Sequence, residues 1–375
     1  MGSNRGFQNM RLTSEYATRH MLSNAMMKEC PISQPNMNKV RLRRWTNITM
    51  TKEVIFQVFC SQWLSHKQVI FGTKCNRLMV LDVNTKHLDL IPSLQSSENS
   101  LPPAAPAQQE CGIHSIEINP SRSLLATGAR NSNDVAVYRL PTLDPICVGE
   151  NAHSDWIFDQ TWLDDQFLVS GSRDGTLAMW RVTEEMVDAV TSADHPSYHY
   201  SKPLMVKRCK QADRVRSLCY NNRTQVRITI IAVRNIIIRK SSQEIAVVSL
   251  NGFIHCWDAG RMKQLMSKRL PHTMENVCLA TDEDCQMYAV GSKVGASSQC
   301  RSTCLYYEHV QAHTDLLDSR TLQPVRKIPS RNSGCGIRSV SFKGNILTIG
   351  TGIGLMLFWD LRASKFLEST MNSNR

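Results

Sequence analysis

Seven basic residues recur at two matched positions of a repeated sequence pattern, where they could bind carboxylates together. At the first position a basic residue is followed by Ser in three copies, at His114, Arg216 and Arg338. The second position follows a pair of small residues and holds Lys74, Arg130, Arg173 and Lys293. Guanidinium groups bind carboxylates through paired hydrogen bonds, and partial desolvation strengthens each contact. Any one of these residues alone would be ordinary solvated surface, but two register-matched columns predict a site for an acidic ligand.

The pattern that carries these residues is a pair of β-strands joined by a tight turn. Each copy has an apolar run, two small residues, a polar turn and an alternating strand, as in residues 167–180. Period-2 alternation and β-branched residues predict strands, and Gly or Asp-Gly supplies the turn. Six copies are legible, beginning at Gln68, Leu124, Phe167, Ile245, Tyr288 and Ile346. The sequence therefore predicts an all-β, WD40-type β-propeller, because a β-sandwich would not give six aligned copies.

The propeller fold would bring the two basic columns together. Equivalent positions of successive blades form a ring about the central channel, and both columns are expected at the same mouth of that channel. A DNA duplex is too wide for such a mouth. Single-stranded RNA would require interleaved aromatic residues, which these columns lack. Nucleic acid is therefore not the expected ligand, although the net charge of +12 keeps an RNA-binding propeller open as an alternative.

Two blades are longer than the usual repeat of about 40–45 residues. The first-strand column recurs after 44 residues between His114 and Phe158, but after 62 and 60 residues on either side of Cys278. The surplus coincides with residues 226–242 and 294–311, which we predict to be insertions. We favour translated intron sequence over genuine loops, because an exposed strand as apolar as 228–238 would promote aggregation.

The remaining segments give the domain organisation. Residues 1–52 form a basic extension, in which 14–28 are predicted to be a helix capped by Ser14. The propeller is expected to span 53–368, followed by a tail at 369–375. Because the chain ends about 15 residues after the last Trp-Asp pair, a seventh blade is expected to be missing or incomplete.

Composition and motifs exclude several classes of function. No stretch has the roughly 18 uninterrupted apolar residues of a membrane helix, so no membrane partner is expected. Thirteen cysteines, scattered in apolar runs, predict reduced thiols in the cytoplasm, the nucleus or both. Nucleotide-binding, metalloprotease, serine-hydrolase and kinase motifs are absent, so neither a catalytic residue nor a cofactor is expected. The cluster Cys300, Cys304, His309 and His313 has spacings too short for a zinc finger, and no metal site is predicted.

Several long motifs resemble one known family. They are Ser61-Gln-Trp-Leu64, Gly72-Thr-Lys-Cys75, Cys111-Gly-Ile-His114, Leu124-Leu-Ala-Thr-Gly128, Tyr138-Arg-Leu-Pro-Thr-Leu-Asp-Pro145, Asp155-Trp-Ile-Phe158, Val169-Ser-Gly-Ser-Arg-Asp-Gly175, Glu275-Asn-Val-Cys-Leu279, Gly336-Ile-Arg-Ser-Val-Ser-Phe342 and Arg362-Ala-x-x-Phe366. They resemble the DCAF family of WD-repeat substrate receptors of the cullin-four RING ubiquitin ligase, in the branch of its twelfth member. The resemblance runs from about residue 55 to residue 368.

The resemblance implies a non-catalytic receptor that docks on the DDB adaptor and presents substrates with acidic, Glu-Glu-type C-termini. It implies that Trp359, Asp360 and Arg362 form the adaptor-docking box, with the 14–28 helix as a second adaptor contact. It maps the degron pocket onto Lys74, Arg173, Arg214, Arg216 and Arg338. Relatives carry Lys where this chain has Gln57, a difference expected to weaken degron binding. A WD-repeat scaffold that binds internal acidic segments remains the other alternative.

Overall fold

The computed structural model describes residues 57–100, 112–189, 198–231, 234–271, 275–293, 312–330 and 336–367. The predicted N-terminal extension with its 14–28 helix, the 369–375 tail and the 294–311 insertion lie outside these residues. In the described part of the chain, no helix is both long and apolar enough to cross a membrane.

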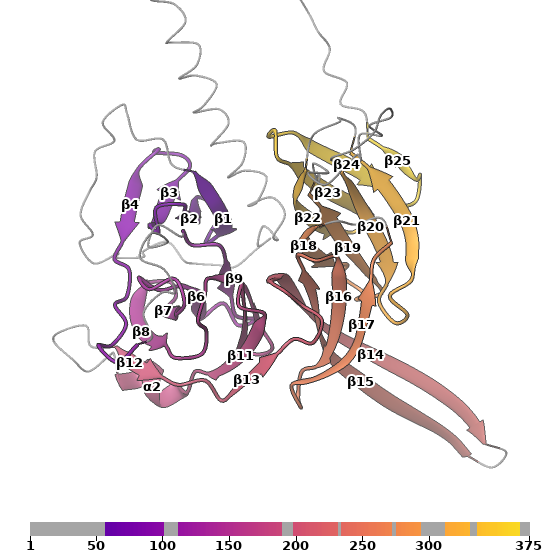
Figure 1. Ribbon diagram of the computed structural model, residues 1–375, viewed down its shortest axis with the longest axis horizontal. Coiled ribbons are helices and arrows are strands. Elements are labelled where there is room, and N and C mark those ends of the chain that lie inside the picture. Colours follow the sequence, from indigo (N-terminus) through magenta and orange to yellow (C-terminus); the bar gives the residue numbers. More distant parts are fainter. Residues whose placement is uncertain are drawn as a thin grey trace, which may run out of the picture.

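Six sheets, antiparallel except for one added strand, succeed one another around a ring (Figure 1). Blade 1 contains β1 (Val58–Trp63), β2 (Gln68–Thr73), β3 (Leu78–Asp82) and β4 (Leu88–Ile91). Blade 2 contains β5 (Ile116–Ile118), β6 (Leu124–Gly128), β7 (Val135–Arg139), β8 (Asp144–Gly149) and the added strand β12 (His199–Ser201). Blade 3 contains β9 (Ile157–Trp162), β10 (Phe167–Ser172), β11 (Thr176–Arg181) and β13 (Met205–Arg208), and the short helix α2 (Glu184–Ala189) lies in its connection.

The other three blades repeat the arrangement. Blade 4 contains β14 (Val215–Ile231), β15 (Arg234–Ser249), β16 (Phe253–Asp258) and β17 (Lys263–Arg269). Blade 5 contains β18 (Asn276–Thr281), β19 (Met287–Ser292), β20 (His313–Asp318) and β21 (Pro324–Pro329). Blade 6 contains β22 (Ile337–Lys343), β23 (Ile346–Thr351), β24 (Met356–Asp360) and β25 (Lys365–Phe366). The predicted six-bladed, all-β propeller is confirmed.

The tight turns between the second and third strands follow from their glycines. Gly175, Gly252 and Gly354 have φ angles of +81°, +89° and +81°. A residue with a Cβ atom rarely adopts this left-handed region, whereas Gly enters it without steric cost. These turns reverse the chain at one common end of the blades, so the two basic columns can meet there.

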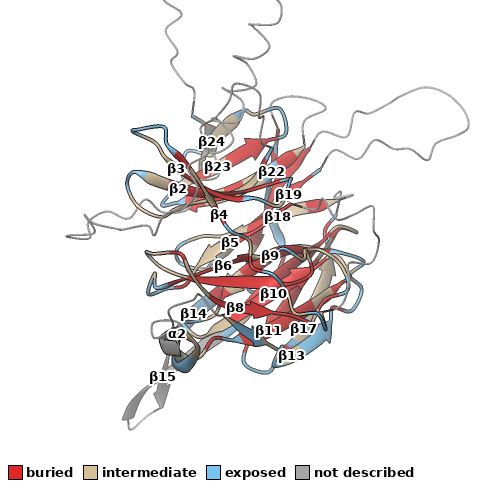
Figure 2. Cartoon of the chain, turned by 90° about the vertical axis from the view of Figure 1, so that its left-hand side faces the viewer, coloured by how far each residue is buried: buried red, intermediate tan, exposed pale blue. Residues whose placement is uncertain are grey.

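The core consists of apolar layers between neighbouring blades, which appear as red strands in Figure 2. Ile146 of blade 2 and Trp180 of blade 3 belong to one buried layer. Val248 of blade 4 and Tyr288 of blade 5 belong to another. Burying one large apolar side chain stabilises the fold by about 1.5–3 kcal/mol. Each blade therefore depends on its neighbours for stability.

Blade 1 is the first and blade 6 the last in the series of blades (Figure 1). In the described residues, no buried cluster joins these two blades. Strand β24 is half-buried along its whole length, whereas its counterparts β7 and β16 are mostly buried. One face of blade 6 is thus less covered than the corresponding faces of blades 2 and 4.

The two predicted insertions have different outcomes. Residues 226–242 continue β14 and β15 as a single long hairpin, paired in register from Asn222 opposite Gln243 to Ile231 opposite Arg234. This hairpin projects from the ring in Figure 1. The second predicted insertion, 294–311, lies between β19 and β20. Gly291 of β19 pairs with Thr314 of β20, so β20 is the predicted third strand of blade 5.

The connection between blades 3 and 4 contains strands that the sequence pattern missed. Residues 205–208 form β13, the outer strand of blade 3, paired with β11. His199 to Ser201 pair in parallel with β8, as a fifth strand of blade 2. Three residues are too few to show a period-2 pattern, so this strand is recognised only from its partner.

Cysteines in the described residues are consistent with the expected reduced state. In the described part of the chain, eight cysteines are not joined in disulfides, and Cys75 is the exposed member of that set. Burial raises the pKa of Cys147 and of Cys278 to about 12. These buried thiols are therefore protonated and unreactive at neutral pH.

Candidate functional site

The two basic columns lie together at one end of the blades because backbone hydrogen bonds join them. In five blades, the amide that follows the second strand donates to the carbonyl that precedes the first strand. The bonds are Lys74 N to Gln57 O (2.8 Å), Arg173 N to Trp156 O (2.8 Å), Leu250 N to Arg214 O (2.9 Å), Lys293 N to Glu275 O (2.9 Å) and Gly352 N to Gly336 O (2.8 Å). We call this end of the propeller the mouth.

One residue of the first strand is bulged at the mouth in five blades. The strand register skips Phe59, Phe158, Arg216, Val277 and Arg338. A β-bulge redirects the side chain of the extra residue. The bulge column therefore defines the ring of side chains at the mouth, and His114 precedes β5 at the corresponding place in blade 2.

The position of the bulge corrects the predicted alignment of blade 5. Blade 5 was expected to contribute Cys278 to the column that contains Arg216 and Arg338. Cys278 instead pairs with Gly291, as Ser217 pairs with Val248 one residue after the bulge. The mouth residue of blade 5 is Val277, because a bulge shifts the alignment by one residue without leaving a sequence signal.

Aromatic side chains connect the mouth residues of blades 1 to 4. The Phe59 and His114 rings are stacked with centroids 4.6 Å apart, and His114 meets Phe158 edge to face at 4.8 Å. The guanidinium carbon of Arg216 lies 4.0 Å from the centroid of the Phe158 ring. The mouth is therefore aromatic on blades 1 to 3 and basic on blades 4 and 6. The expectation that the columns lack interleaved aromatic residues is wrong.

Arg216 is a largely buried cation of the mouth. Its Nε atom is buried and has no hydrogen-bond partner among the described residues. Burial lowers the pKa of Arg216, and the positive charge of nearby Arg338 lowers it further. Burial and the same Arg216 charge also lower the pKa of His114 to about 3, so His114 is neutral. A cation held in this way gains stability from an anion, because a desolvated charge without a partner is costly.

Arg173 stands beside this group on blade 3. Its guanidinium carbon lies 4.7 Å from the centroid of the Trp156 ring, and its Nε atom is 3.5 Å from Asp155 Oδ2. The side chains of Arg173 and Asp155 are each 22 % exposed. Since the ion pair is partly open to solvent, Arg173 can still bind a second carboxylate.

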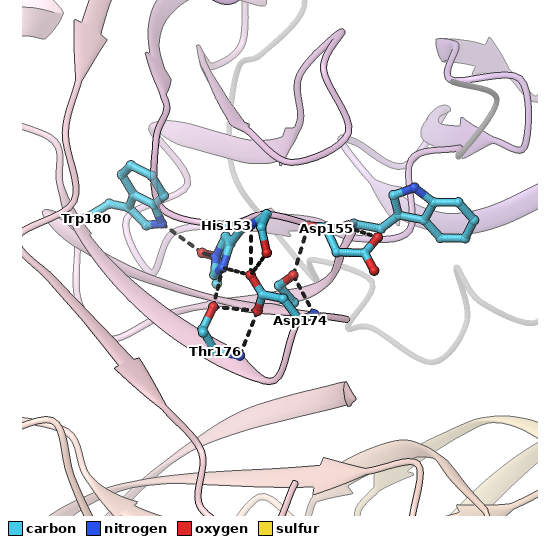
Figure 3. Close-up of polar contacts among 9 residues, drawn as sticks. His153, Asp155, Asp174, Thr176 and Trp180 are labelled. Carbon is cyan, nitrogen blue, oxygen red and sulfur yellow. Dashed lines mark hydrogen bonds and ion pairs between the residues drawn. The ribbon is translucent and has the colours of Figure 1, made fainter. Parts of the chain in front are cut away.

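A buried polar network fixes the turn that carries Arg173 (Figure 3). The two ring nitrogens of His153 lie 2.8 Å from Thr176 Oγ1 and 2.7 Å from Ser170 Oγ. Asp174 Oδ1 accepts from the Thr176 amide at 2.8 Å. Burial raises the pKa of Asp174, but hydrogen bonds from His153 and Thr176 outweigh burial and hold the pKa well below its ordinary value. The network is structural and sets the position of Arg173.

The other predicted residues are exposed at this end of the blades. Lys74, Arg130, Arg214, Lys293 and Arg338 are all exposed. Lys293 Nζ is 3.0 Å from Glu275 Oε2, so its charge is already paired. The Arg130 amide donates to Leu94 O, in the connection from blade 1, and not to the inner strand of its own blade. The structure thus connects Arg216 with Arg338 and His114, but it does not join Arg130 or Lys293 to this group.

Asp159 is a residue of the mouth that sequence reasoning missed. Its carboxylate accepts from Ser115 Oγ at 3.1 Å, from Ser217 Oγ at 2.7 Å and from Leu218 N at 2.9 Å. Blade 3 is thereby linked to blades 2 and 4. The sequence signal for this contact was the Ser that follows His114 and Arg216, because the hydroxyls of those two serines donate to Asp159.

The predicted adaptor-docking residues lie at the opposite end of blade 6. Strand β24 runs away from the mouth and ends at Asp360, whose Oδ1 accepts from Arg362 N at 2.8 Å and from Ala363 N at 2.9 Å. The Trp359 and Phe366 rings are in contact, with centroids 4.8 Å apart. Arg362 is exposed. Two hydrogen bonds to Asp360 therefore hold this turn, while Arg362 is accessible to a partner.

The cluster of Cys300, Cys304, His309 and His313, at which no metal site was predicted, lies mostly outside the described residues. Cys300, Cys304 and His309 lie outside them. His313 is buried in β20, where its Nε2 atom is 3.3 Å from Asp315 and its backbone amide bonds Ser292 Oγ. Within the described ranges, no three His, Cys, Asp or Glu side chains are grouped to hold a metal.

Comparisons with known proteins agree with this geometry. The chain is similar in fold to the crystal structure of the computationally designed Ika8 protein, with a TM-score of 0.52 and 15% sequence identity. That similarity covers 83% of this chain and 73% of the designed chain, and at such identity it concerns the fold alone. The profile of the family described as DDB1- and CUL4-associated factor 12 beta propeller matches residues 43–375. Since this match spans most of the sequence, the chain belongs to the DDB1- and CUL4-associated factor 12 β-propeller family.

Proposed function

We propose that this chain is a non-catalytic substrate receptor of a cullin-four RING ubiquitin ligase. In this role it binds proteins with acidic, Glu-Glu-type C-termini at the mouth and docks on the DDB adaptor from the opposite end. The family name associates its namesake with DDB1 and CUL4. The mouth supports the finer proposal about the ligand, and blade 6 supports the docking proposal.

The single observation that carries the ligand proposal is the state of Arg216. Its guanidinium group is buried against Phe158, its Nε atom has no partner in the described residues, and a second cation, Arg338, is near. A poorly solvated cation with a second, exposed cation near it favours a ligand with several negative charges. A C-terminal Glu-Glu brings two side-chain carboxylates and the terminal carboxylate within one dipeptide.

The other basic residues extend this site. We assign Arg173 and Arg216 to the inner part of the degron pocket, because both stack on aromatic rings that orient their guanidinium groups. Lys74, Arg214 and Arg338 are exposed around them and attract the acidic tail before it binds. His114 is neutral and contributes packing against Phe59, so it adds no charge to the pocket.

Docking through blade 6 leaves the mouth free. The turn with Trp359, Asp360 and exposed Arg362 is at the end of the blade opposite to the mouth. Adaptor and substrate can therefore bind at the same time, as a receptor must allow. Loss of adaptor binding in Arg362→Ala, with unchanged affinity for acidic peptides, is the expected result.

The ligand proposal is tested with three peptides of one sequence, ending in Glu-Glu, in amidated Glu-Glu and in Lys-Lys. Isothermal titration calorimetry with the full chain should show binding to the first, weaker binding to the second and none to the third. Arg173→Glu should abolish binding of the first peptide. Equal affinity for all three peptides, or an unchanged affinity in Arg173→Glu, contradicts the proposal. An affinity that survives amidation indicates a scaffold for internal acidic segments.

A second candidate ligand, single-stranded RNA, is favoured by the aromatic residues at the mouth. Phe59, His114, Trp156 and Phe158 form a connected set of rings beside Arg173 and Arg216. Bases stack on such rings, and RNA binding weakens steeply with salt. Competition decides between the two ligands: an acidic peptide that fails to displace a bound oligonucleotide favours RNA.

A further inference from the structure

The outer strands of blades 3 and 4 carry basic residues and no acidic ones. Residues 199–212 and 261–270 contain no Asp or Glu. Their basic members are Lys202, Lys207, Arg208, Lys210, Arg261, Lys263, Lys268 and Arg269. Outer strands β4 and β8 contain Asp89 and Asp144, whereas β21 carries Arg326 and Lys327 without an acidic residue. Part of the positive charge of the chain therefore lies on the outer strands of blades 3 and 4.

Within the part of the chain that the structure describes, no ion pair neutralises these charges. Lys207, Arg208 and Lys210 are exposed, as are Lys263 and Arg269. Across the described ranges, none of the eight forms an ion pair. Lys268 is more constrained, because its Nζ atom is buried without a hydrogen-bond partner among the described residues. The fold keeps these like charges close together although they repel one another.

The two outer strands are fixed relative to each other by one side chain. The Gln264 amide of β17 accepts from Lys210 N at 2.8 Å and donates to Lys210 O at 3.2 Å. Lys210 comes two residues after β13, and much of β13 is pale blue in Figure 2. We call the exposed side chains of these two strands and their flanks the outer basic surface.

Apolar side chains are exposed among these charges. Leu204 is 52% exposed, Val206 40% and Leu265 54%. They are among the most exposed large apolar side chains of the described residues. Tyr200, 50% exposed, lies on the neighbouring strand β12. Such aliphatic residues do not stack on nucleic-acid bases, but they can pack against aliphatic side chains of a protein.

Basic residues on edge strands have a simpler explanation, but it does not account for the exposed aliphatic side chains among them. Lys residues and bulges on edge strands prevent sheets from pairing with other chains. Exposed Leu265 and Val206 act against that purpose. Edge protection therefore does not explain why aliphatic side chains are exposed among these basic residues.

We propose that the outer basic surface binds an acidic segment of a partner protein in which carboxylates alternate with aliphatic side chains. The carboxylates would meet Lys207, Lys210, Lys263 and Arg269. The aliphatic side chains would cover Leu265 and its neighbours. This site does not use the mouth and does not require a free C-terminus. It would therefore hold an internal segment of a substrate or a regulator while the mouth is occupied.

The test uses a short acetylated and amidated peptide of Glu-Val repeats, which has no free carboxyl terminus for the mouth. Fluorescence anisotropy with the full chain should show binding of this peptide, weaker binding of Glu-Ser repeats and none of Lys-Val repeats. Lys207→Glu/Lys263→Glu should weaken binding about tenfold or more, because two attractions become repulsions. Lys67→Glu/Lys86→Glu, which makes the same charge change on exposed residues of blade 1, should leave the affinity unchanged.

Three results would overturn this inference. The first is no binding of the Glu-Val peptide by a folded protein, as judged by its circular dichroism. The second is equal binding of Glu-Val and Glu-Ser repeats, which removes the role of the exposed aliphatic residues. The third is that an oligouridine binds this surface more tightly than the peptide and loses affinity in Lys207→Glu/Lys263→Glu. Arg216→Glu separates this site from the mouth, since that variant should bind the Glu-Val peptide normally.

Discussion

The guanidinium carbon of Arg216 lies 4.0 Å from the centroid of the Phe158 ring, in the adjacent blade. Both residues occupy the bulge of their first strand, so the contact depends on the register of two sheets. The ring shields one face of the cation from water and leaves its Nε atom without a partner in the described residues. The pairing positions a strongly basic group at the mouth.

Replacing Phe158 should therefore weaken binding of a Glu-Glu peptide without removing any charge. A cation–π contact contributes about 0.5–2 kcal/mol, and its loss in Phe158→Leu should weaken affinity by about 2- to 30-fold. Calorimetric titration measures this effect. Phe167→Leu is a matched control, because the guanidinium carbon of Arg181 lies 5.8 Å from the centroid of the Phe167 ring at the end of blade 3 opposite to the mouth. A similar loss of affinity in both variants means that the Phe158 contact has no specific role.

Asp159→Ala should destabilise the propeller. The change leaves the Ser115 and Ser217 hydroxyls and the Leu218 amide without their acceptor, which should cost about 1–3 kcal/mol. Urea denaturation measures the free energy of unfolding. Asp164→Ala removes a carboxylate that caps an exposed turn through Gln166 N and Phe167 N, and it should cost less than about 1 kcal/mol. Equal costs for the two variants contradict a role for Asp159 in joining the blades.

Gln57→Lys should increase the affinity for acidic peptides. Gln57 is exposed at the mouth, and its carbonyl accepts from the Lys74 amide, so a lysine there adds a charge beside Lys74. An exposed ion pair contributes about 0.2–1 kcal/mol, which corresponds to a gain of up to about fivefold. Gln62→Lys on the same strand is the control, because Gln62 pairs with Ile70 farther from the mouth. No gain in Gln57→Lys, or the same gain in both variants, excludes residue 57 from the binding site.

Stability should fall as the pH is lowered from 6.5 towards 4. Burial and the Arg216 charge lower the pKa of His114 to about 3, and burial lowers the pKa of His255 to about 4. Between these values and the ordinary pKa near 6.5, the unfolded chain binds protons that the folded chain does not. The stability that neutral His114 and His255 contribute is thus fully present above pH 6.5, and it is lost as the pH falls through this window. His114→Phe should flatten the dependence of Tm on pH, and an identical dependence in wild type and variant contradicts a neutral, buried His114.

The blades could be predicted from sequence because each has its own local signals. Glycine turns and alternating strands place the hairpins, such as β10 and β11, and Trp-Asp marks the end of β16 and β24. The assignment of Cys278 to the mouth was off by one, because a bulge leaves no mark in the residue pattern. Strand β12 was missed because its pairing partner, β8, is far away in the sequence.

The basic columns were also visible in the sequence, whereas their surroundings were not. Spacing alone identified Arg216 and Arg338, but it could not show that Phe158 packs under Arg216 from the next blade. Asp159 looks like any strand aspartate until Ser115 and Ser217 are brought to it from two neighbouring blades. Contacts between blades depend on how neighbouring blades pack against each other, and no single repeat encodes them.

The most direct test of the mouth as an acidic C-terminus site is a double-mutant cycle between Arg216 and the terminal carboxylate. Wild type and Arg216→Met are each titrated with a Glu-Glu peptide in its free-acid and amidated forms. A direct charge contact predicts a coupling energy of at least about 1.5 kcal/mol, so amidation should matter far less in Arg216→Met than in wild type. The same loss on amidation in both proteins, and hence no coupling, would contradict binding of the C-terminus at Arg216.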